Sequence, residues 1–166
     1  MADTVDVVMA REALPGNGSP AIFLAGPTPS AQDVPSWRPG AIDLIRARWP
    51  AAGEPLTVLS PESRGGRRAA KYDDQVDWES AARAAATVIL FWIPRDLRKL
   101  PGFTTNVEFG LDVGLGREAV LGAPPGCPNP ERNRYLIHVA RRHGVPVFDT
   151  LAEAVAHALT VVTGLR

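Results

Sequence analysis

Apolar runs and amphipathic segments alternate along the chain from residue 21 onward. Five runs are apolar at nearly every position, as expected of strands that are covered on both faces of a parallel sheet. These runs are Ala21–Gly26, Leu56–Ser60, Thr87–Ile93, Ala119–Ala123 and Val145–Asp149. The segments between and after them carry apolar residues at helical spacing. The predicted helices are Trp37–Trp49, Asp74–Ala86, Thr105–Gly116, Glu131–His143 and Thr150–Val162.

Five strand–helix units in succession predict an α/β fold with a doubly wound, five-stranded parallel sheet of flavodoxin-like or Rossmann-like order. We expect residues 21–166 to form this single domain and residues 1–20 to be an N-terminal extension. Ligands of such folds bind beyond the carboxyl ends of the strands, so we expect the functional site there. The residues at four of these ends are Gly26-Pro27-Thr28, Ser60-Pro61-Glu62, Pro94-Arg95-Asp96 and Ala123-Pro124.

Composition narrows the class of protein. The 18 basic residues equal the 18 acidic ones, so no net charge favours nucleic acid or an anionic membrane as a partner. One cysteine forms no internal disulfide and suits a reducing compartment. The start of the chain lacks a secretory pattern, and the longest apolar stretch, Thr87–Pro94, is too short to span a bilayer. We therefore expect a soluble, cytoplasmic protein.

Glu108 is the strongest candidate for chemistry. It lies in the segment LPGFTTNVEFG, which follows the most apolar strand and opens a helix. A carboxylate in the first turn of a helix is held in its ionised form and could attack an anomeric carbon. The alternative is structural, because Thr105-Asn106-Val107-Glu108 also has the pattern of a capping box, with Thr105 as the N-cap.

Two loops are candidates for ligand binding. Gly26, at the end of the first strand, would let a ligand approach the backbone, and Thr28 follows with a hydroxyl. The glycine pattern of a dinucleotide site is absent. After the second strand, a basic loop containing Arg64, Arg67 and Arg68 could hold a substrate phosphate, or could simply be solvated.

Other side chains leave more than one interpretation open. Trp78, Trp92 and Phe103 could stack on a base, although aromatic residues also build cores. The three histidines lie on helical segments without ligand spacing, so we expect no metal, and the sequence indicates no cofactor.

Taken together, these motifs resemble the nucleoside 2-deoxyribosyltransferase family, in particular its divergent "2-deoxyribosyltransferase-like" branch. The resemblance extends from about Ile22 to Pro146. It rests on IFLAGP, SWRPGAIDLI, DQVDWE, FWIPR, LPGFTTNVEFG and NRYL, which occur in the order expected for the family.

The resemblance implies roles for individual residues. Glu108, followed by Phe109 and Gly110, would be the nucleophile that takes the deoxyribosyl group. Glu79, or alternatively Asp77, would orient the sugar hydroxyls. The remaining residues expected to bind substrate are Gly26, Pro27, Thr28, Trp92, Phe103, Thr105, Asn106 and Asn133.

This chain departs from the family at one position. The family has an aspartate six residues before the nucleophile, which helps to protonate the departing base. Here Gly102 occupies that position, and the nearest acid is Asp96. Asp96 is therefore the candidate for the general acid.

We accordingly expect an enzyme that cleaves or exchanges the N-glycosidic bond of a nucleoside or nucleotide. One alternative is a nucleoside or nucleotide N-hydrolase, because the Pro-Gly…Thr…Glu run faintly resembles phosphoribohydrolases that release cytokinin bases. The other alternative is a non-catalytic nucleotide-binding module. Family members complete the pocket with a residue from a neighbouring subunit, which implies a homodimer or a higher even oligomer.

Overall fold

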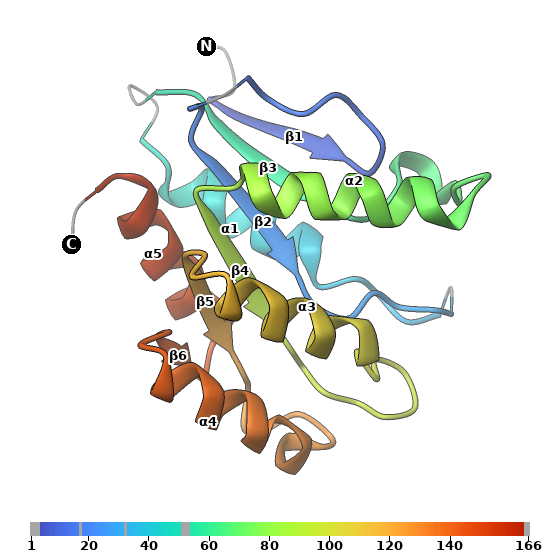
Figure 1. Ribbon diagram of the computed structural model, residues 1–166, viewed down its shortest axis with the longest axis vertical. Coiled ribbons are helices and arrows are strands. Elements are labelled where there is room, and N and C mark those ends of the chain that lie inside the picture. Colours follow the sequence, from blue (N-terminus) through green and yellow to red (C-terminus); the bar gives the residue numbers. More distant parts are fainter. Residues whose placement is uncertain (1–3, 17, 32, 51–53, 165–166) are drawn as a thin grey trace.

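The computed structural model describes residues 4–16, 18–31, 33–50 and 54–164. A single sheet of six parallel strands lies between two layers of helices (Figure 1). The strands are β1 (Val5–Met9), β2 (Ala21–Ala25), β3 (Leu56–Ser60), β4 (Val88–Trp92), β5 (Ala119–Gly122) and β6 (Val147–Phe148). The helices are α1 (Arg38–Arg48), α2 (Tyr72–Ala85), α3 (Phe103–Gly114), α4 (Arg134–Arg142) and α5 (Leu151–Val162), with short 3₁₀ turns at Arg64–Gly66 and Pro130–Asn133.

The predicted α/β class and parallel sheet are confirmed, and the strand order is β1-β3-β2-β4-β5-β6. Strands β2 to β6 alone have the flavodoxin-like order, but the prediction of five strands is wrong by one. The extra strand, β1, lies in the N-terminal segment and pairs with β3 at the edge of the sheet. Its sequence, VDVVM, contains the exposed Asp6, and only Val5 and Val8 are fully buried, so a search for runs that are apolar on both faces misses it.

Each face of the sheet has its own apolar core. Strand residues such as Ile22, Leu56 and Leu90 pack with α1 and α5 on one face. Phe23, Phe91 and their neighbours pack with α2, α3 and α4 on the other. Strand β2 lies between β3 and β4, and the chain leaves β3 through α2 to reach β4. The carboxyl end of β2 is therefore next to the switch point where such sheets bind ligands.

The loop from Ile93 to Gly102 fixes where α3 begins. Arg95 in this loop is 2% exposed, and its guanidinium donates to the carbonyl oxygens of Pro101 and Gly102 and to the side-chain oxygen of Asn106. Gly102 has a φ of 64°, a left-handed conformation that favours glycine, and α3 begins at the next residue. The helix thus starts two residues earlier than the sequence predicted.

None of the helices in the described parts of the chain is long and apolar enough to cross a membrane.

Candidate active site

A cavity of about 510 Å³ lies between α2, α3 and the carboxyl end of β2. The loop after β2 provides one wall, with Gly26, Pro27 and Thr28. Residues of α2 between Tyr72 and Arg83 and residues of α3 between Phe103 and Leu111 provide the others. Seven of the residues predicted to form the site line this cavity: Gly26, Pro27, Thr28, Glu79, Phe103, Thr105 and Glu108. The position agrees with the ligand edge expected of this fold.

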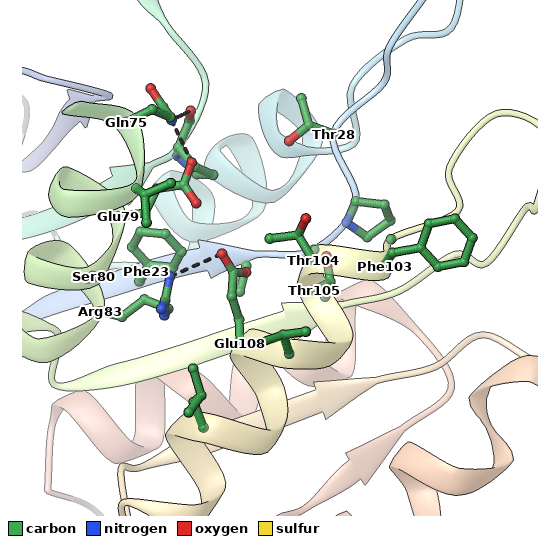
Figure 2. A pocket seen from close by; sticks show the side chains of 18 of the residues that line it. Phe23, Thr28, Gln75, Glu79, Ser80, Arg83, Phe103, Thr104, Thr105 and Glu108 are labelled. Atoms are coloured by element: carbon green, nitrogen blue, oxygen red, sulfur yellow. Dashed lines mark hydrogen bonds and ion pairs between the residues drawn. The ribbon is translucent and has the colours of Figure 1, made fainter. Parts of the chain in front are cut away.

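Glu108 projects from α3 toward α2, where Arg83 meets it (Figure 2). The Arg83 Nη1 atom lies 3.1 Å from Oε1 of Glu108, and its Nε atom lies 2.9 Å from Oδ2 of Asp112. Asp112 is completely buried and also pairs with Arg117. Buried ion pairs add little to stability, because desolvation offsets their attraction. The linked ion pairs of Arg117, Asp112, Arg83 and Glu108 are therefore not explained by stability alone. Because they end at a cavity, they favour a functional role for Glu108.

The structure corrects one expectation about Glu108 and bears on a second. Because α3 begins at Phe103, Glu108 lies in the second turn, so it is neither in the first turn nor part of a capping box begun by Thr105. It was also expected to be ionised at neutral pH. Burial raises the pKa of Glu108 to about 7. A hydrogen bond with Glu79 and the negative charges of Glu79 and Asp112 also raise this pKa, whereas the positive charge of Arg83 lowers it. Glu108 therefore changes its protonation state close to neutral pH.

Glu79 projects from α2 into the same space, so the cavity holds two carboxyl groups (Figure 2). Its Oε1 atom accepts a hydrogen bond of 2.6 Å from Nε2 of Gln75, one helical turn earlier. The same amide nitrogen donates to the carbonyl oxygen of Pro61, after β3. Gln75 thus fixes Glu79 relative to the sheet, whereas Asp77, the predicted alternative, is exposed and does not line the cavity.

The loop after β2 is held rigidly by Arg38, which is 1% exposed. Its guanidinium donates to the carbonyl oxygens of Leu24 and Gly26 and to Oγ1 of Thr28. Gly26 has a φ of 148°, and a Cβ atom there would lie 2.2 Å from the Trp92 carbonyl oxygen. Residue 26 is therefore a glycine because the Trp92 carbonyl oxygen and the ring of Trp37 leave no room for a side chain.

A model of the family described as "Nucleoside 2-deoxyribosyltransferase like" matches residues 19–127, more than half of the chain. The chain belongs to this family. A search of curated proteins found no match to the chain. The matched range contains β2, β3, β4, α2 and α3, the elements that build the cavity of this deoxyribosyltransferase-like protein.

The backbone conformation at residue 102 accounts for the glycine that stands where the family has an aspartate. The backbone there is left-handed, and a Cβ atom would lie 3.0 Å from Nη1 of Arg95. An aspartate at this position would therefore be strained. Asp96 does not replace it: its Oδ1 atom accepts hydrogen bonds from the backbone nitrogens of Arg98 and Lys99, and it does not line the cavity.

Three residues expected to bind substrate also lie outside the cavity. Trp92 is 9% exposed and packs in the core, against Gly122. Asn106 and Asn133 both accept hydrogen bonds from Arg95, and Asn133 also donates to the Ile93 carbonyl oxygen. These two amides support the loop that leads into α3.

The basic loop borders a second cavity, of about 450 Å³. Arg67 and Arg68 line it, together with Arg11 and Glu62. Arg64 does not: its guanidinium pairs with Glu12 at 2.6 Å and holds the pKa of that carboxyl at about 2. Of the three predicted phosphate ligands, Arg67 and Arg68 line this second cavity and Arg64 does not.

Sequence reasoning missed Arg83 and Arg38, although a spacing signal was available for the first. Arg83 follows Glu79 by four residues, just as Asp112 follows Glu108 by four. Residues four apart lie on one face of a helix, so each helix carries a second charge one turn beyond its carboxylate. Within the described residues, no cluster of three or more His, Cys, Asp or Glu side chains could hold a metal ion.

Proposed function

We propose that this protein cleaves the N-glycosidic bond of a nucleoside-type substrate and transfers the sugar, with Glu108 as the nucleophile. The observation that carries this proposal is the placement of Glu108 and Glu79 in one cavity at the ligand edge of the sheet, with Arg83 bound to Glu108. Membership of the family supports the substrate class.

The first step forms one bond and breaks one. A carboxylate oxygen of Glu108 attacks the anomeric carbon, and the electron pair of the C–N bond leaves with the base. Glu108 becomes a neutral ester of the sugar, its negative charge leaves with the base, and Arg83 remains beside the carbonyl oxygen of that ester. In the second step, a ring nitrogen of an incoming base attacks the anomeric carbon, gives up its proton and displaces Glu108 as the carboxylate. Two displacements retain the configuration at the anomeric carbon.

The departing base must gain a proton. Gly102 provides none, and Glu79 and Glu108 are the only acids among the described residues that line the cavity. We propose that the proton comes through Glu79 or from water, and that Glu79 also binds the sugar hydroxyls.

The same geometry supports hydrolysis as a second candidate function. Two strongly exposed rings, Tyr72 and Phe103, line the cavity and are 75% and 71% exposed, so solvent reaches this part of its wall. Water that enters in place of a second base would release the free sugar. Incubation with and without an acceptor base, followed by chromatography, separates transfer from hydrolysis.

We further propose that a second subunit covers the exposed face of α3. Phe103, Val107, Leu111 and Leu115 follow one another at intervals of four residues, and each is more than half exposed. The first three also line the cavity. An apolar stripe of this kind is typical of an interface, and a partner seated on it would close the cavity.

The substitution Glu108→Gln tests the nucleophile. A neutral amide keeps the size of the side chain but does not form the ester, so we expect normal folding and a loss of base release of at least about a thousandfold. Base release from a panel of nucleosides and nucleotides is measured by chromatography, and folding by circular dichroism. Glu118→Gln, an exposed acid outside the cavity, is the control. Near-parental turnover by Glu108→Gln would show that Glu108 is not the nucleophile.

A further inference from the structure

The second cavity adjoins the one that contains Glu108. Thr28, Pro61, Tyr72 and Gln75 line both. Gln75 is one helical turn from Glu79, and residues so spaced lie about 5–6 Å apart on a helix face. A ligand whose sugar is bound near Glu79 therefore has its substituents within reach of the second cavity.

Positive charge dominates the second cavity. Arg11, Arg67 and Arg68 line it, against a single acid, Glu62. Glu62 already lies 3.5 Å from the buried guanidinium of Arg38 and accepts a hydrogen bond of 2.8 Å from Ser36. Its charge is thus compensated from within the fold.

Arg67 and Arg68 are exposed, and in the parts of the chain that the structure describes neither has an acidic partner. Arg64 on the same loop does have one, Glu12. The arginines of the loop therefore have two different roles. Arg64 holds the loop against the protein, whereas the guanidinium groups of Arg67 and Arg68 can bind an anion.

Arg11 places this loop over the cavity. It follows β1 in a left-handed conformation, with a φ of 68°. Its guanidinium donates to Oγ of Ser63 at 2.9 Å, to the carbonyl oxygen of Arg67 at 2.8 Å and to Oε1 of Gln75 at 2.5 Å. Arg11 lies outside residues 19–127, the range that the family model matches. The contacts of Arg11 with the basic loop are therefore not part of the matched family pattern. The extra strand β1 thereby connects the basic loop to the helix that carries Glu79.

We infer that the second cavity binds the phosphate of a nucleoside 5′-monophosphate whose sugar and base occupy the first cavity. Paired guanidinium groups match the oxygens of a phosphate in both geometry and charge. The inference rests on the proposed function for the orientation of the sugar, but the binding site itself does not depend on catalysis.

The test compares binding of a nucleoside with that of its 5′-monophosphate by titration calorimetry. The Glu108→Gln protein is used so that the ligand stays intact. It is compared with the same protein carrying Arg67→Gln and Arg68→Gln. The matched control carries Arg141→Gln and Arg142→Gln, an exposed arginine pair at the end of α4 that lines neither cavity.

We expect the monophosphate to bind at least about tenfold more tightly than the nucleoside, with a preference that weakens as salt is added. The change at Arg67 and Arg68 should abolish the preference and leave nucleoside affinity unchanged, whereas the control should keep it. Inorganic phosphate should compete with the monophosphate and not with the nucleoside. Equal affinity for both ligands, or a preference that survives the loss of Arg67 and Arg68, overturns the inference. So does inorganic phosphate that binds as tightly as the monophosphate, because the site would then hold a free anion.

Failure of this inference differs from failure of the proposed function. If the parent protein releases base but shows no preference for monophosphates, the phosphate site is wrong and the function stands. If it releases base from no substrate but keeps a preference that depends on Arg67 and Arg68, the function is wrong and the phosphate site stands.

Discussion

Glu108 is subject to opposing influences that its sequence neighbours do not reveal. Burial favours its protonated form, and Arg83 favours its ionised form. The sequence identified Glu108 through its motif and its place after β4, but Arg83 lies 25 residues earlier, on another helix. Only the packing of α2 against the sheet beside α3 brings the two charges within 3.1 Å. The place of Glu108 at the ligand edge of the sheet could thus be predicted from the sequence, whereas its ion pair with Arg83 could not.

The raised pKa of Glu108 predicts the pH dependence of catalysis. A nucleophilic carboxylate must be ionised, so kcat/KM for base release should rise as the pH increases through about 7 and fall at lower pH. The profile is measured with a substrate whose base does not titrate in this range. A kcat/KM that stays constant from neutral pH down to about pH 5 contradicts the assignment, since an unperturbed glutamate titrates near 4.3.

Replacing Arg83 should move this profile. Arg83→Met removes the cation that favours the ionised form of Glu108, so its pKa should rise further. We expect kcat/KM to fall at least about tenfold at pH 7 and to recover partly at higher pH. Arg83→Lys should shift the profile less. Arg117→Met, which removes the other partner of Asp112 without touching Glu108, is the control. A loss of activity that is equal at every pH would assign Arg83 a structural role only.

At the scale of elements, the sequence predicted the parallel sheet and its five helices but placed the start of α3 two residues late. The pattern Thr-x-x-Glu suggested a cap, whereas Gly102 and the buried Arg95 start the helix at Phe103. The side chain of Arg95 reaches four later residues, and the spacing of apolar positions does not reveal such contacts. This shift moves Glu108 from a capping position to the cavity wall.

Gly102 should therefore be sensitive to substitution. In Gly102→Ala, a Cβ atom would lie 3.0 Å from Nη1 of Arg95 in a left-handed backbone, which costs about 1–2 kcal/mol. We expect a lower melting temperature and weaker base release, because the start of α3 shifts. Gly110→Ala on the same helix is the matched control. No atom lies within 4 Å of its added methyl group, so the free energy of unfolding should rise by up to about 1 kcal/mol. Equal stability changes in the two variants would contradict this account of Gly102.

At the scale of the whole molecule, the site is closed on one side and open on the other. Phe23 and Ala25 of β2 line it together with Arg83 and Glu108, whereas Tyr72, Phe103 and the apolar stripe of α3 are exposed. The order of motifs along the chain predicted which edge of the sheet carries the site. It did not predict this stripe, because Val107, Leu111 and Leu115 have the spacing of core residues and the fold leaves them exposed.

The apolar stripe of α3 also has a consequence for the oligomeric state. If a second subunit covers it, the parent protein should be a dimer or a multiple of dimers by light scattering. Leu115→Lys places a charge on the stripe outside the cavity, near the end of α3 where the helix dipole tolerates a cation. It should favour the monomer, because a buried unpaired charge opposes association. It should also lower base release, since the cavity then stays open. Ala156→Lys, on the exposed face of α5 across the sheet, should change neither property. A parent protein that is a stable, active monomer rules out the shared site, because a cavity that works without a partner needs no second subunit to complete it.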